Sequence, residues 1–415
     1  MGGAAEPPST MAVFDAAFEA MGKVLKNSGY HSQVVYGGEH AQSKKLVERY
    51  FPGLRKDLNA SNLNDALNTL RADIRAGRIK EGDQLLVVNM NHGQPRAPGV
   101  KSHEVNLNQG TFNMDDLIDL RNEAEKAGVK LAIIDQSCYS GSSIPLGTPK
   151  TCVTSITGAD YVGHTSEIRD FWLASRRGKS IEETFLDARK KRHMPTAARI
   201  SGAPGDKTYE LLKGAQKHLL NYASEVHKKL RKWEGCYSCF HPDPETVAGT
   251  LNLREIAAQA AIPGKDLSKL KTAVEDHARI YRKLESVWQV ERSLAQKTVV
   301  IAGRKWKWDH LATFDLLGET KMYQELLAKE KRPGWQAHYR RMLKILPEVG
   351  KKSIELANSD KRFASIPNLS RQIVEHTEAL RRAAGAVKVA EGEIYDALYR
   401  NLRGERPNPC ADFVL

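Results

Sequence analysis

Short apolar runs alternate with stretches of helical periodicity along the first half of the chain. The runs Leu85–Val88 and Leu131–Ile134 are continuously apolar, which is typical of strands buried on both faces of a parallel sheet. A repeated order of strand, helix and strand favours an α/β domain with crossover helices. We therefore predict strands at Gln33–Tyr36, Gln84–Asn91, Lys130–Asp135 and Thr151–Ile156.

Two amphipathic helices are predicted between these strands, and both have recognisable ends. The first stops before Gly77, since glycine readily takes the left-handed conformation of a helix cap. The second begins after Asn113, which is a good N-cap residue, and ends before Gly128. Their apolar positions, at helical spacing, are Leu63, Leu67, Leu70 and Ile74, and then Met114, Leu117, Leu120, Ala124 and Ala127.

The pattern changes after the turn-rich stretch Ser201–Gly205, where long helical periods replace the strand signals. One apolar stripe runs from Leu212 to Leu230, and two distant long helices of this kind are expected to pair antiparallel. A second stripe recurs at seven-residue intervals, at Ile373, Leu380, Val387 and Ile394. The predicted organisation is an N-terminal segment (1–30), an α/β domain (31–206) and a mainly helical domain (207–415).

A cysteine and a histidine each follow one of the predicted parallel strands. Cys138 comes shortly after Leu131–Ile134, and His92 follows Asn91 directly. Because the carboxyl ends of parallel strands open into one crevice, we expect the two side chains to meet. Imidazole can activate a thiol near neutral pH, and the N–H groups of Gly93 and Cys138 would form an oxyanion hole. A lone Cys or His is usually structural, but their conjunction at two strand ends favours a catalytic dyad.

At these residues the chain resembles the caspase, metacaspase, legumain and clostripain superfamily of cysteine peptidases. The run Cys138–Gly141 looks like the Cys-Tyr-Ser-Gly of bacterial members, and His92–Gly93 follows an earlier strand. His92 precedes Cys138 by 138 − 92 = 46 residues, close to the roughly 50 residues found in caspases. The resemblance covers roughly residues 30–205. It implies a caspase-like, mostly parallel sheet flanked by helices, and a cysteine endopeptidase that acts on proteins or peptides without a cofactor.

The resemblance also points to residues that bind substrate. In such peptidases the strand and loop after the nucleophile's strand form a wall of the P1 pocket, which here corresponds to Thr151–Asp160. Asp160 lies in a glycine-rich loop, where a carboxylate can pair with a substrate Arg or Lys, and Ser155 is assigned to the same pocket. A basic P1 residue is therefore favoured, while Arg96 leaves an acidic one open.

Two further polar residues near the expected dyad have other candidate roles. His103, in the loop 94–110, is the competing general base. We prefer His92, because a strand end holds a side chain more firmly than a loop does. Asp135, which ends the strand before Cys138, is expected to be an orienting or structural group.

The chain has five cysteines, too few for a disulfide scaffold but enough for one bridge. Cys236 and Cys239 lie beside His241, but a zinc site lacks a clear fourth ligand there and a redox site lacks its strand. We predict a disulfide from Cys410 to Cys236 or Cys239, Cys152 in the core, and no metal site. Because disulfides persist outside the cytosol, a secreted or periplasmic location is favoured over a cytoplasmic one.

Composition and charge change this picture little. Of the 415 residues, 41% are hydrophobic and 27% are charged, which is typical of a folded chain. No apolar run is long enough for a membrane span, and Met1–Thr10 lacks the apolar core of a signal peptide.

The formal net charge of +13 raises nucleic-acid binding as a rival function. In Arg304–His310 basic residues alternate with indoles, an arrangement that can stack on single strands. A packed strand or helix edge is the favoured interpretation of that run, and nucleic acid is not favoured as a partner. A second rival is an inactive peptidase fold that serves as a scaffold or binding protein.

Overall fold

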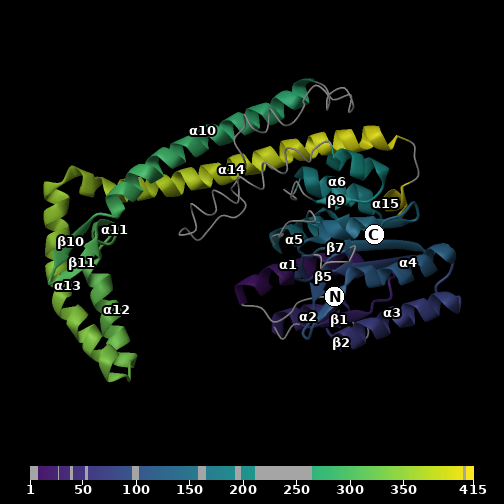
Figure 1. Cartoon of the computed structure of the whole chain (residues 1–415), viewed down its shortest axis with the longest axis horizontal. Helices are drawn as coiled ribbons and strands as arrows, with labels where there is room; N and C mark the ends of the chain where they lie inside the picture. The colour runs from purple at the N-terminus through teal and green to yellow at the C-terminus, as the bar shows by residue number, and fades with distance from the viewer. Residues whose placement is uncertain are drawn as a thin grey trace. The chain divides into compact units, whose positions relative to one another are not determined.

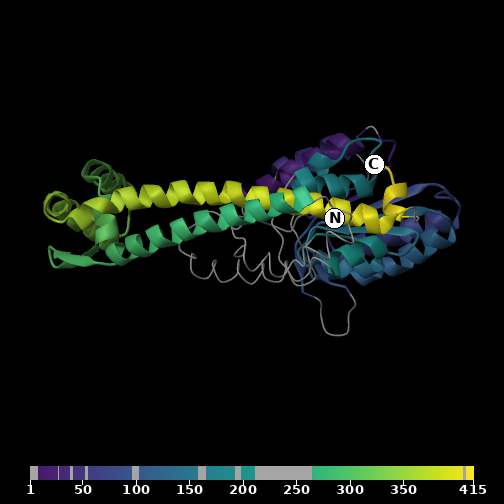
Figure 2. The same ribbon diagram turned by 90° about the horizontal axis from the view of Figure 1, so that it is seen from above.

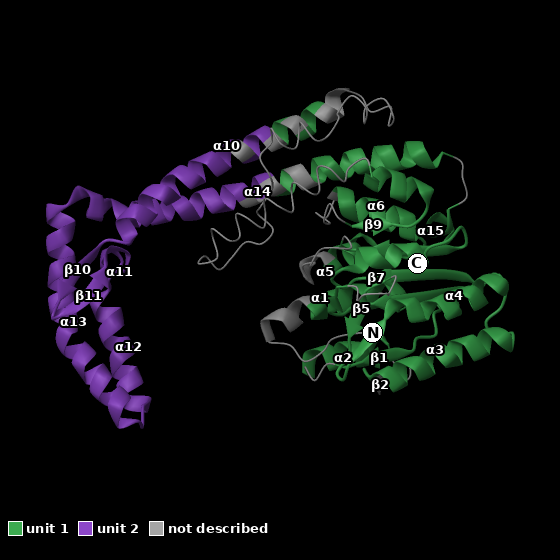
Figure 3. Ribbon diagram, viewed as in Figure 1, with its two compact units in different colours: residues 1–234, 240–274, 384–415 green, residues 235–239, 275–383 purple. Residues whose placement is uncertain are grey.

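The computed structural model describes residues 8–26, 28–37, 41–51, 55–95, 102–157, 165–191, 198–210, 264–404 and 408–415. The chain divides into two compact units (Figure 3). Unit 1 comprises residues 1–234, 240–274 and 384–415, and unit 2 comprises residues 235–239 and 275–383.

The centre of unit 1 is a mixed sheet with the strand order β3-β7-β8-β9. The first three strands are parallel, and β9 is antiparallel to β8. Every residue of β7 except Lys130 is buried, because helices cover both faces. The predicted α/β architecture is confirmed at this level. The strands are β3 (Gln84–Asn89), β7 (Lys130–Asp135), β8 (Thr151–Ser155) and β9 (Arg199–Ile200).

Two smaller sheets accompany the central one in unit 1. The first is a parallel pair of β1 (Val34–Tyr36) and β2 (Arg55–Asp57). The second is antiparallel and lies in the region expected to be a loop; it consists of β4 (Gly93–Gln94), β5 (Glu104–Asn106) and β6 (Thr111–Asn113).

Helices of unit 1 cover the central sheet (Figure 1), and side chains of β7 alternate between two hydrophobic clusters. Ala132 and Ile134 contact the cluster that contains residues of α1, α2, α5 and α6, whereas Ile133 contacts the cluster of α3 and α4. This alternation follows from the period of two in a strand. The helices of unit 1 named here are α1 (Pro8–Leu25), α2 (Ala41–Tyr50), α3 (Ala60–Arg75), α4 (Leu117–Lys126), α5 (Thr165–Ala174) and α6 (Ile181–Lys191).

The predicted helix ends are confirmed. Gly77 and Gly128, which follow α3 and α4, both have φ of +69°, a conformation that favours glycine. Asn113 accepts a hydrogen bond from the Asp115 N–H at 2.9 Å and caps the short 3₁₀ helix η1 (Met114–Asp116) that leads into α4.

The N-terminal segment is not separate from the α/β domain, as residues 1–30 were expected to be. Helix α1 contributes Phe14, Phe18 and Met21 to the same buried cluster as β7. Burying these large side chains is strongly favourable and accounts for the docking of α1.

The expected helical domain 207–415 is not one unit, because unit 1 continues to residue 234 and also includes residues 384–415. Ile394 and Leu398, on α14 (Lys361–Arg403), are buried in the cluster of unit 1. Beyond α14, the short helix α15 (Pro409–Asp412) carries Cys410, which forms a disulfide with Cys152 of β8.

That bridge corrects the predicted disulfide. Cys410 is disulfide-bonded as expected, but its partner is Cys152, while Cys236 and Cys239 lie outside the described residues. Cys152 is buried in the strand, as predicted, and the Cα atoms of the pair are 4.8 Å apart. The pairing follows from the return of the C-terminal segment to unit 1, where Leu415 donates its N–H to the Lys179 carbonyl at 2.9 Å.

Buried polar groups join α6 to the C-terminal part of α14. The Arg189 guanidinium lies 3.9 Å from the centre of the Tyr395 ring and contacts Glu391 at 3.6 Å. Asn408 donates hydrogen bonds to Glu182, at 2.7 Å, and to the Tyr399 hydroxyl. Burial raises the pKa of Tyr395 to about 12 and raises the pKa of Tyr399 as well, while loss of water lowers the pKa of Arg189.

A loss of stability is therefore expected in alkaline solution. An exposed tyrosine has a pKa of about 10, whereas that of Tyr395 in the folded chain is about 12. The folded state thus holds the phenolic proton more tightly, so this contribution is complete below about pH 10 and is lost as the pH rises towards 12. Absorbance of tyrosinate, recorded together with circular dichroism, measures it.

Tyr395→Phe is a suitable comparison, because the Tyr395 hydroxyl is buried with no hydrogen-bond partner among the described residues. We expect this variant to unfold at a higher alkaline pH than the unsubstituted chain. An unchanged midpoint would contradict the assignment of alkaline unfolding to this buried phenol.

Unit 2 is mainly helical, with one antiparallel hairpin (Figure 2). Ile373 and Leu380 of the predicted seven-residue stripe are buried against α10 residues such as Leu284. The stripe Leu212–Leu230 lies outside the described residues, so the helix that pairs with α14 in unit 2 is α10. The elements are α10 (Gly264–Ala295), β10 (Thr298–Ile301), β11 (Arg304–Lys307), α11 (Trp308–Ala312), α12 (Leu316–Lys329) and α13 (Pro333–Ser359), with α14.

The aromatic and basic run Arg304–His310 forms β11 and the start of α11. Trp308 is buried with Phe363 and Val349, and the Trp306 ring packs against the same cluster. The prediction of a packed strand or helix edge is confirmed. Within the described residues, no helix is both long and apolar enough to cross a membrane.

Candidate active site

The loops that carry His92 and Cys138 leave the sheet side by side. Asn89 at the end of β3 is paired with Asp135 at the end of β7. The N–H of Gln136 donates to the Asn89 carbonyl at 2.7 Å, which extends the pairing one residue beyond the strand. The register of the two strands therefore brings the two predicted catalytic segments to one edge of the sheet.

Cys138 lies in a sharp turn between β7 and the 3₁₀ helix η2 (Ser140–Leu146). Its side chain is partly exposed and outside the disulfide. The next residue, Tyr139, has φ of 60° and ψ of 13°, a left-handed conformation that costs a non-glycine residue energy. Backbone strain of this kind clusters at functional sites, where the surrounding structure maintains it.

Hydrogen bonds from the end of β8 hold the turn in place. The Ser140 N–H donates to the Thr157 hydroxyl at 2.9 Å. The Ser140 hydroxyl accepts from the N–H groups of Ile156 and Thr157, both at 3.2 Å. The turn after Cys138 is thereby tied to the neighbouring strand rather than left as a free loop.

Gly93 is in direct contact with the main chain of Cys138. A Cβ atom at position 93 would overlap the Cys138 carbonyl oxygen and lie 2.9 Å from its carbonyl carbon. The Asn106 N–H donates to the His92 carbonyl at 2.9 Å, which makes Gly93 and Val105 a non-hydrogen-bonded pair of the β4–β5 ladder. The Gly93 N–H therefore points away from β5, as a donor to an oxyanion must.

His92 is held by its neighbours in sequence and by α1. Its N–H donates to the Asn91 side chain at 2.8 Å, and its ring makes an edge contact with Phe14, with centroids 6.1 Å apart. The side chain is partly exposed, as is that of Cys138. The fold thus brings Gly93, the residue after His92, against the main chain of Cys138, and the pairing of the His92 and Cys138 side chains stays a prediction.

Of the two residues predicted to bind substrate, the structure describes only Ser155. Ser155 is 1% exposed, and its hydroxyl donates to the Thr157 carbonyl at 2.9 Å and accepts from the Arg199 N–H at 3.2 Å. Its assignment to substrate binding is therefore corrected to an internal role at the end of β8. Asp160 and Arg96 lie outside the described residues.

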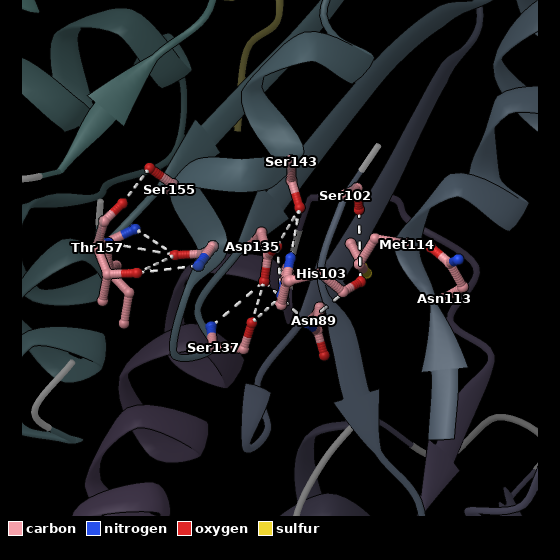
Figure 4. A network of polar contacts seen from close by, with 12 residues as sticks. Asn89, Ser102, His103, Asn113, Met114, Asp135, Ser137, Ser143, Ser155 and Thr157 are labelled. Carbon is pink, nitrogen blue, oxygen red and sulfur yellow. Dashed lines mark hydrogen bonds and ion pairs between the residues drawn. The ribbon is translucent and has the colours of Figure 1, made fainter. Parts of the chain in front are cut away.

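A buried polar network lies behind the turn (Figure 4). The Asp135 carboxylate accepts hydrogen bonds from Asn89 at 2.8 Å, from the Ser137 hydroxyl at 2.7 Å and from the Ser143 hydroxyl at 2.5 Å. The His103 ring joins the same group, with Nε2 2.8 Å from Ser137 Oγ and Nδ1 3.4 Å from Ser143 Oγ. Asp135 is thus a structural group, one of the two roles expected of it.

The burial of His103 is evidence against its alternative role as the general base. Its side chain is 0% exposed, so substrate and water do not reach it. The arrangement is not a Ser-His-Asp triad either, because Ser137 and Asp135 both approach the same ring nitrogen, and the Ser137 proton goes to Asp135. No sequence pattern predicts this network, since it is the β4–β5–β6 sheet that places His103 next to β7.

The described part of the chain contains no cluster of three His, Cys, Asp or Glu side chains placed to hold a metal ion. The groups present at this edge of the sheet are a thiol, an imidazole and main-chain donors. Such a set suits nucleophilic attack on a carbonyl group.

Gly93→Ala is expected to damage both stability and the geometry at Cys138. The added methyl group meets the backbone, which cannot move aside cheaply, so we expect a cost of roughly 1–3 kcal/mol in the free energy of unfolding. Gly334→Ala is the matched control, because nothing lies within 4 Å of a Cβ atom there. Urea unfolding of both variants measures the difference, and equal stability would contradict the close contact with Cys138.

Comparison with known proteins does not place this geometry in a family. No protein-family model matches the chain, and no curated protein gives a match. The function is therefore argued from the residues at the carboxyl ends of β3, β7 and β8.

Proposed function

We propose that unit 1 is a cysteine endopeptidase of the caspase-like kind, with Cys138 as nucleophile and His92 as general acid and base. The observation that carries the proposal is the contact of Gly93 with the Cys138 main chain at the paired ends of β3 and β7. It puts the residue after His92 against the residue that bears the thiol. Both residues are partly exposed, although the Nε2 atom of His92 is itself buried.

The reaction follows the usual course of nucleophilic catalysis by a thiolate. The Cys138 sulfur attacks the scissile carbonyl carbon, and the negative charge that develops on the oxygen is stabilised by the N–H groups of Gly93 and Cys138. The imidazole of His92 takes the thiol proton and gives it to the leaving amine as the C–N bond breaks. It then takes a proton from water, whose oxygen attacks the thioester, and it returns this proton to the Cys138 sulfur as the C–S bond breaks and the acid is released.

A basic P1 residue completes the proposal. It rests on the resemblance of the motifs and on Asp160, whose carboxylate suits a guanidinium or ammonium partner. Fluorogenic peptides that differ only at P1 test this preference. We expect Arg or Lys to be cleaved faster than Asp, and unchanged cleavage of Arg by Asp160→Asn would overturn the assignment of that residue.

Labelling with an acyloxymethyl ketone peptide tests the proposed activity itself. The reagent alkylates an activated active-site cysteine, and mass mapping identifies the modified residue. We expect the label on Cys138 in the unsubstituted chain and its loss in His92→Ala. A chain that takes no label and cleaves no peptide would instead be an inactive peptidase fold with a scaffold or binding role.

A further inference from the structure

The buried network behind Cys138 has more hydrogen-bonding oxygen atoms than a neutral histidine can satisfy. The hydroxyl groups of Ser137 and Ser143 each have one proton, and both protons point to Asp135, at 2.7 and 2.5 Å. These distances match hydrogen bonds from hydroxyl groups to an ionised carboxylate. Each hydroxyl oxygen is then left to accept a proton from the His103 ring.

Both nitrogen atoms of His103 face such oxygens. Nε2 lies 2.8 Å from Ser137 Oγ and 3.4 Å from Asp135 Oδ2, and Nδ1 lies 3.4 Å from Ser143 Oγ. A neutral imidazole has one N–H, so its other ring nitrogen would face a serine oxygen with no proton between the two lone pairs. Only the imidazolium donates from both nitrogens.

The surroundings of Asp135 favour the charged form of the pair. Its Oδ1 atom also accepts from the Asn89 side chain at 2.8 Å and from the Ser137 N–H at 3.3 Å. Asp135 and His103 are both 0% exposed, and a buried carboxylate needs donors and an opposite charge. Among the described residues, His103 is the one cationic group recorded in contact with that carboxylate.

The pair lies next to Gly93, which also contacts the main chain of the proposed nucleophile. A Cβ atom at Gly93 would be 3.1 Å from His103 Cδ2 and would overlap the carbonyl oxygen of Cys138. Ser137, which donates to Asp135 and lies near His103 Nε2, is the residue before Cys138. Ser143, the other hydroxyl of the network, belongs to η2. The pair thus holds the backbone on both sides of the left-handed turn.

We infer that His103 is a positioning residue, which is protonated in this network and whose buried ion pair with Asp135 fixes the turn that carries Cys138. The inferred protonation rests on the hydrogen-bond geometry of the network. Its importance for peptide hydrolysis rests on the proposed function. The sequence-based alternative, in which His103 exchanges protons with the substrate, is incompatible with this role.

Nuclear magnetic resonance of the full chain labelled with [¹⁵N]histidine tests the protonation state. At about pH 8 an ordinary histidine is neutral, since its pKa is about 6.5. We expect one imidazole in which both nitrogens keep their protons and give signals protected from exchange, and we expect Ser143→Ala to shift them. If every imidazole at that pH shows the pattern of a neutral ring, the charged pair is overturned in favour of a neutral Asp135–His103 pair.

Two substitutions test the positioning role. His103→Gln removes the charge, and His31→Gln is the control because His31 is exposed in the same unit. The readouts are the rate at which iodoacetamide alkylates Cys138, kcat and KM for a peptide, and thermal stability. We expect His103→Gln to slow alkylation and to lower kcat by about 100-fold, as small misplacements of reacting groups do, with KM changed far less.

The outcomes separate this inference from the proposed function. Unchanged alkylation in a folded His103→Gln protein would overturn the positioning role. Should that variant fail to fold, Ser143→Ala replaces it in the same measurements. If the chain hydrolyses no peptide at all, the resonance and alkylation experiments still decide the inference, while the proposed activity alone is lost.

Discussion

Replacing Cys138 by alanine is expected to abolish peptide hydrolysis while leaving the fold intact. Loss of a catalytic nucleophile typically lowers kcat by a factor on the order of 10⁵ or more. The side chain is partly exposed and belongs to none of the buried hydrophobic clusters, so we expect the free energy of unfolding to change by less than about 1 kcal/mol. Hydrolysis of a fluorogenic peptide and thermal unfolding measure the two effects.

His92→Ala should be nearly as damaging as Cys138→Ala, and the double variant should be no worse than either. Members of one catalytic unit are non-additive, because each needs the other to act. If Cys138→Ala still hydrolyses the peptide, Cys138 is not the nucleophile. If the protein is active without His92 but inactive without His103, the buried His103 is the general base.

The central sheet could be predicted because its signals are local. Residues Lys130–Asp135 form β7 with the predicted bounds, since a strand buried on both faces must be a continuous apolar run. Helix ends could also be predicted, because Gly77 and Gly128 adopt a left-handed conformation that is energetically unfavourable for other residues. The contact of Gly93 with the Cys138 main chain then follows from the parallel register of β3 and β7.

Features that depend on long-range packing could not be predicted in the same way. Strands β4, β5 and β6 are two or three residues long, too short to show a period of two. They fold the segment expected to be a loop into a sheet and bring His103 behind β7, which no spacing in the sequence indicates. Ser155 was misassigned for a related reason: its exposure depends on β9, whose Arg199 N–H donates to it.

The largest error in the predicted organisation was that it kept both ends of the chain apart from the α/β domain, to which they dock. Phe14 and Phe18 have the spacing of an apolar helix face, but sequence does not say which surface such a face covers. Cysteine connectivity is likewise not contained in spacing, because several pairings fit the same number of thiols. The bridge from Cys410 to Cys152 required knowing that α15 lies beside β8.

Removing this disulfide is expected to have a large effect on stability. The bond joins residues separated by 258 positions, so it restricts the unfolded chain strongly. We expect Cys410→Ala to lower the free energy of unfolding by about 2–5 kcal/mol, a typical cost for a native disulfide. Alanine is preferred to serine because the site is 0% exposed and a new hydroxyl would be buried there.

The pairing itself is tested by a double-mutant cycle. Cys152→Ala and Cys410→Ala should each cause the loss, and the double variant should lose little more than either, because both single changes break the same bond. A reductant should destabilise the unsubstituted chain to the level of the variants and leave the variants unaffected, as measured by urea unfolding. Losses that add, or peptide mapping that finds Cys152 and Cys410 as thiols without reductant, would contradict the bridge. The backbone bonds of Val414 and Leu415 would then be what fixes the C-terminal segment to unit 1.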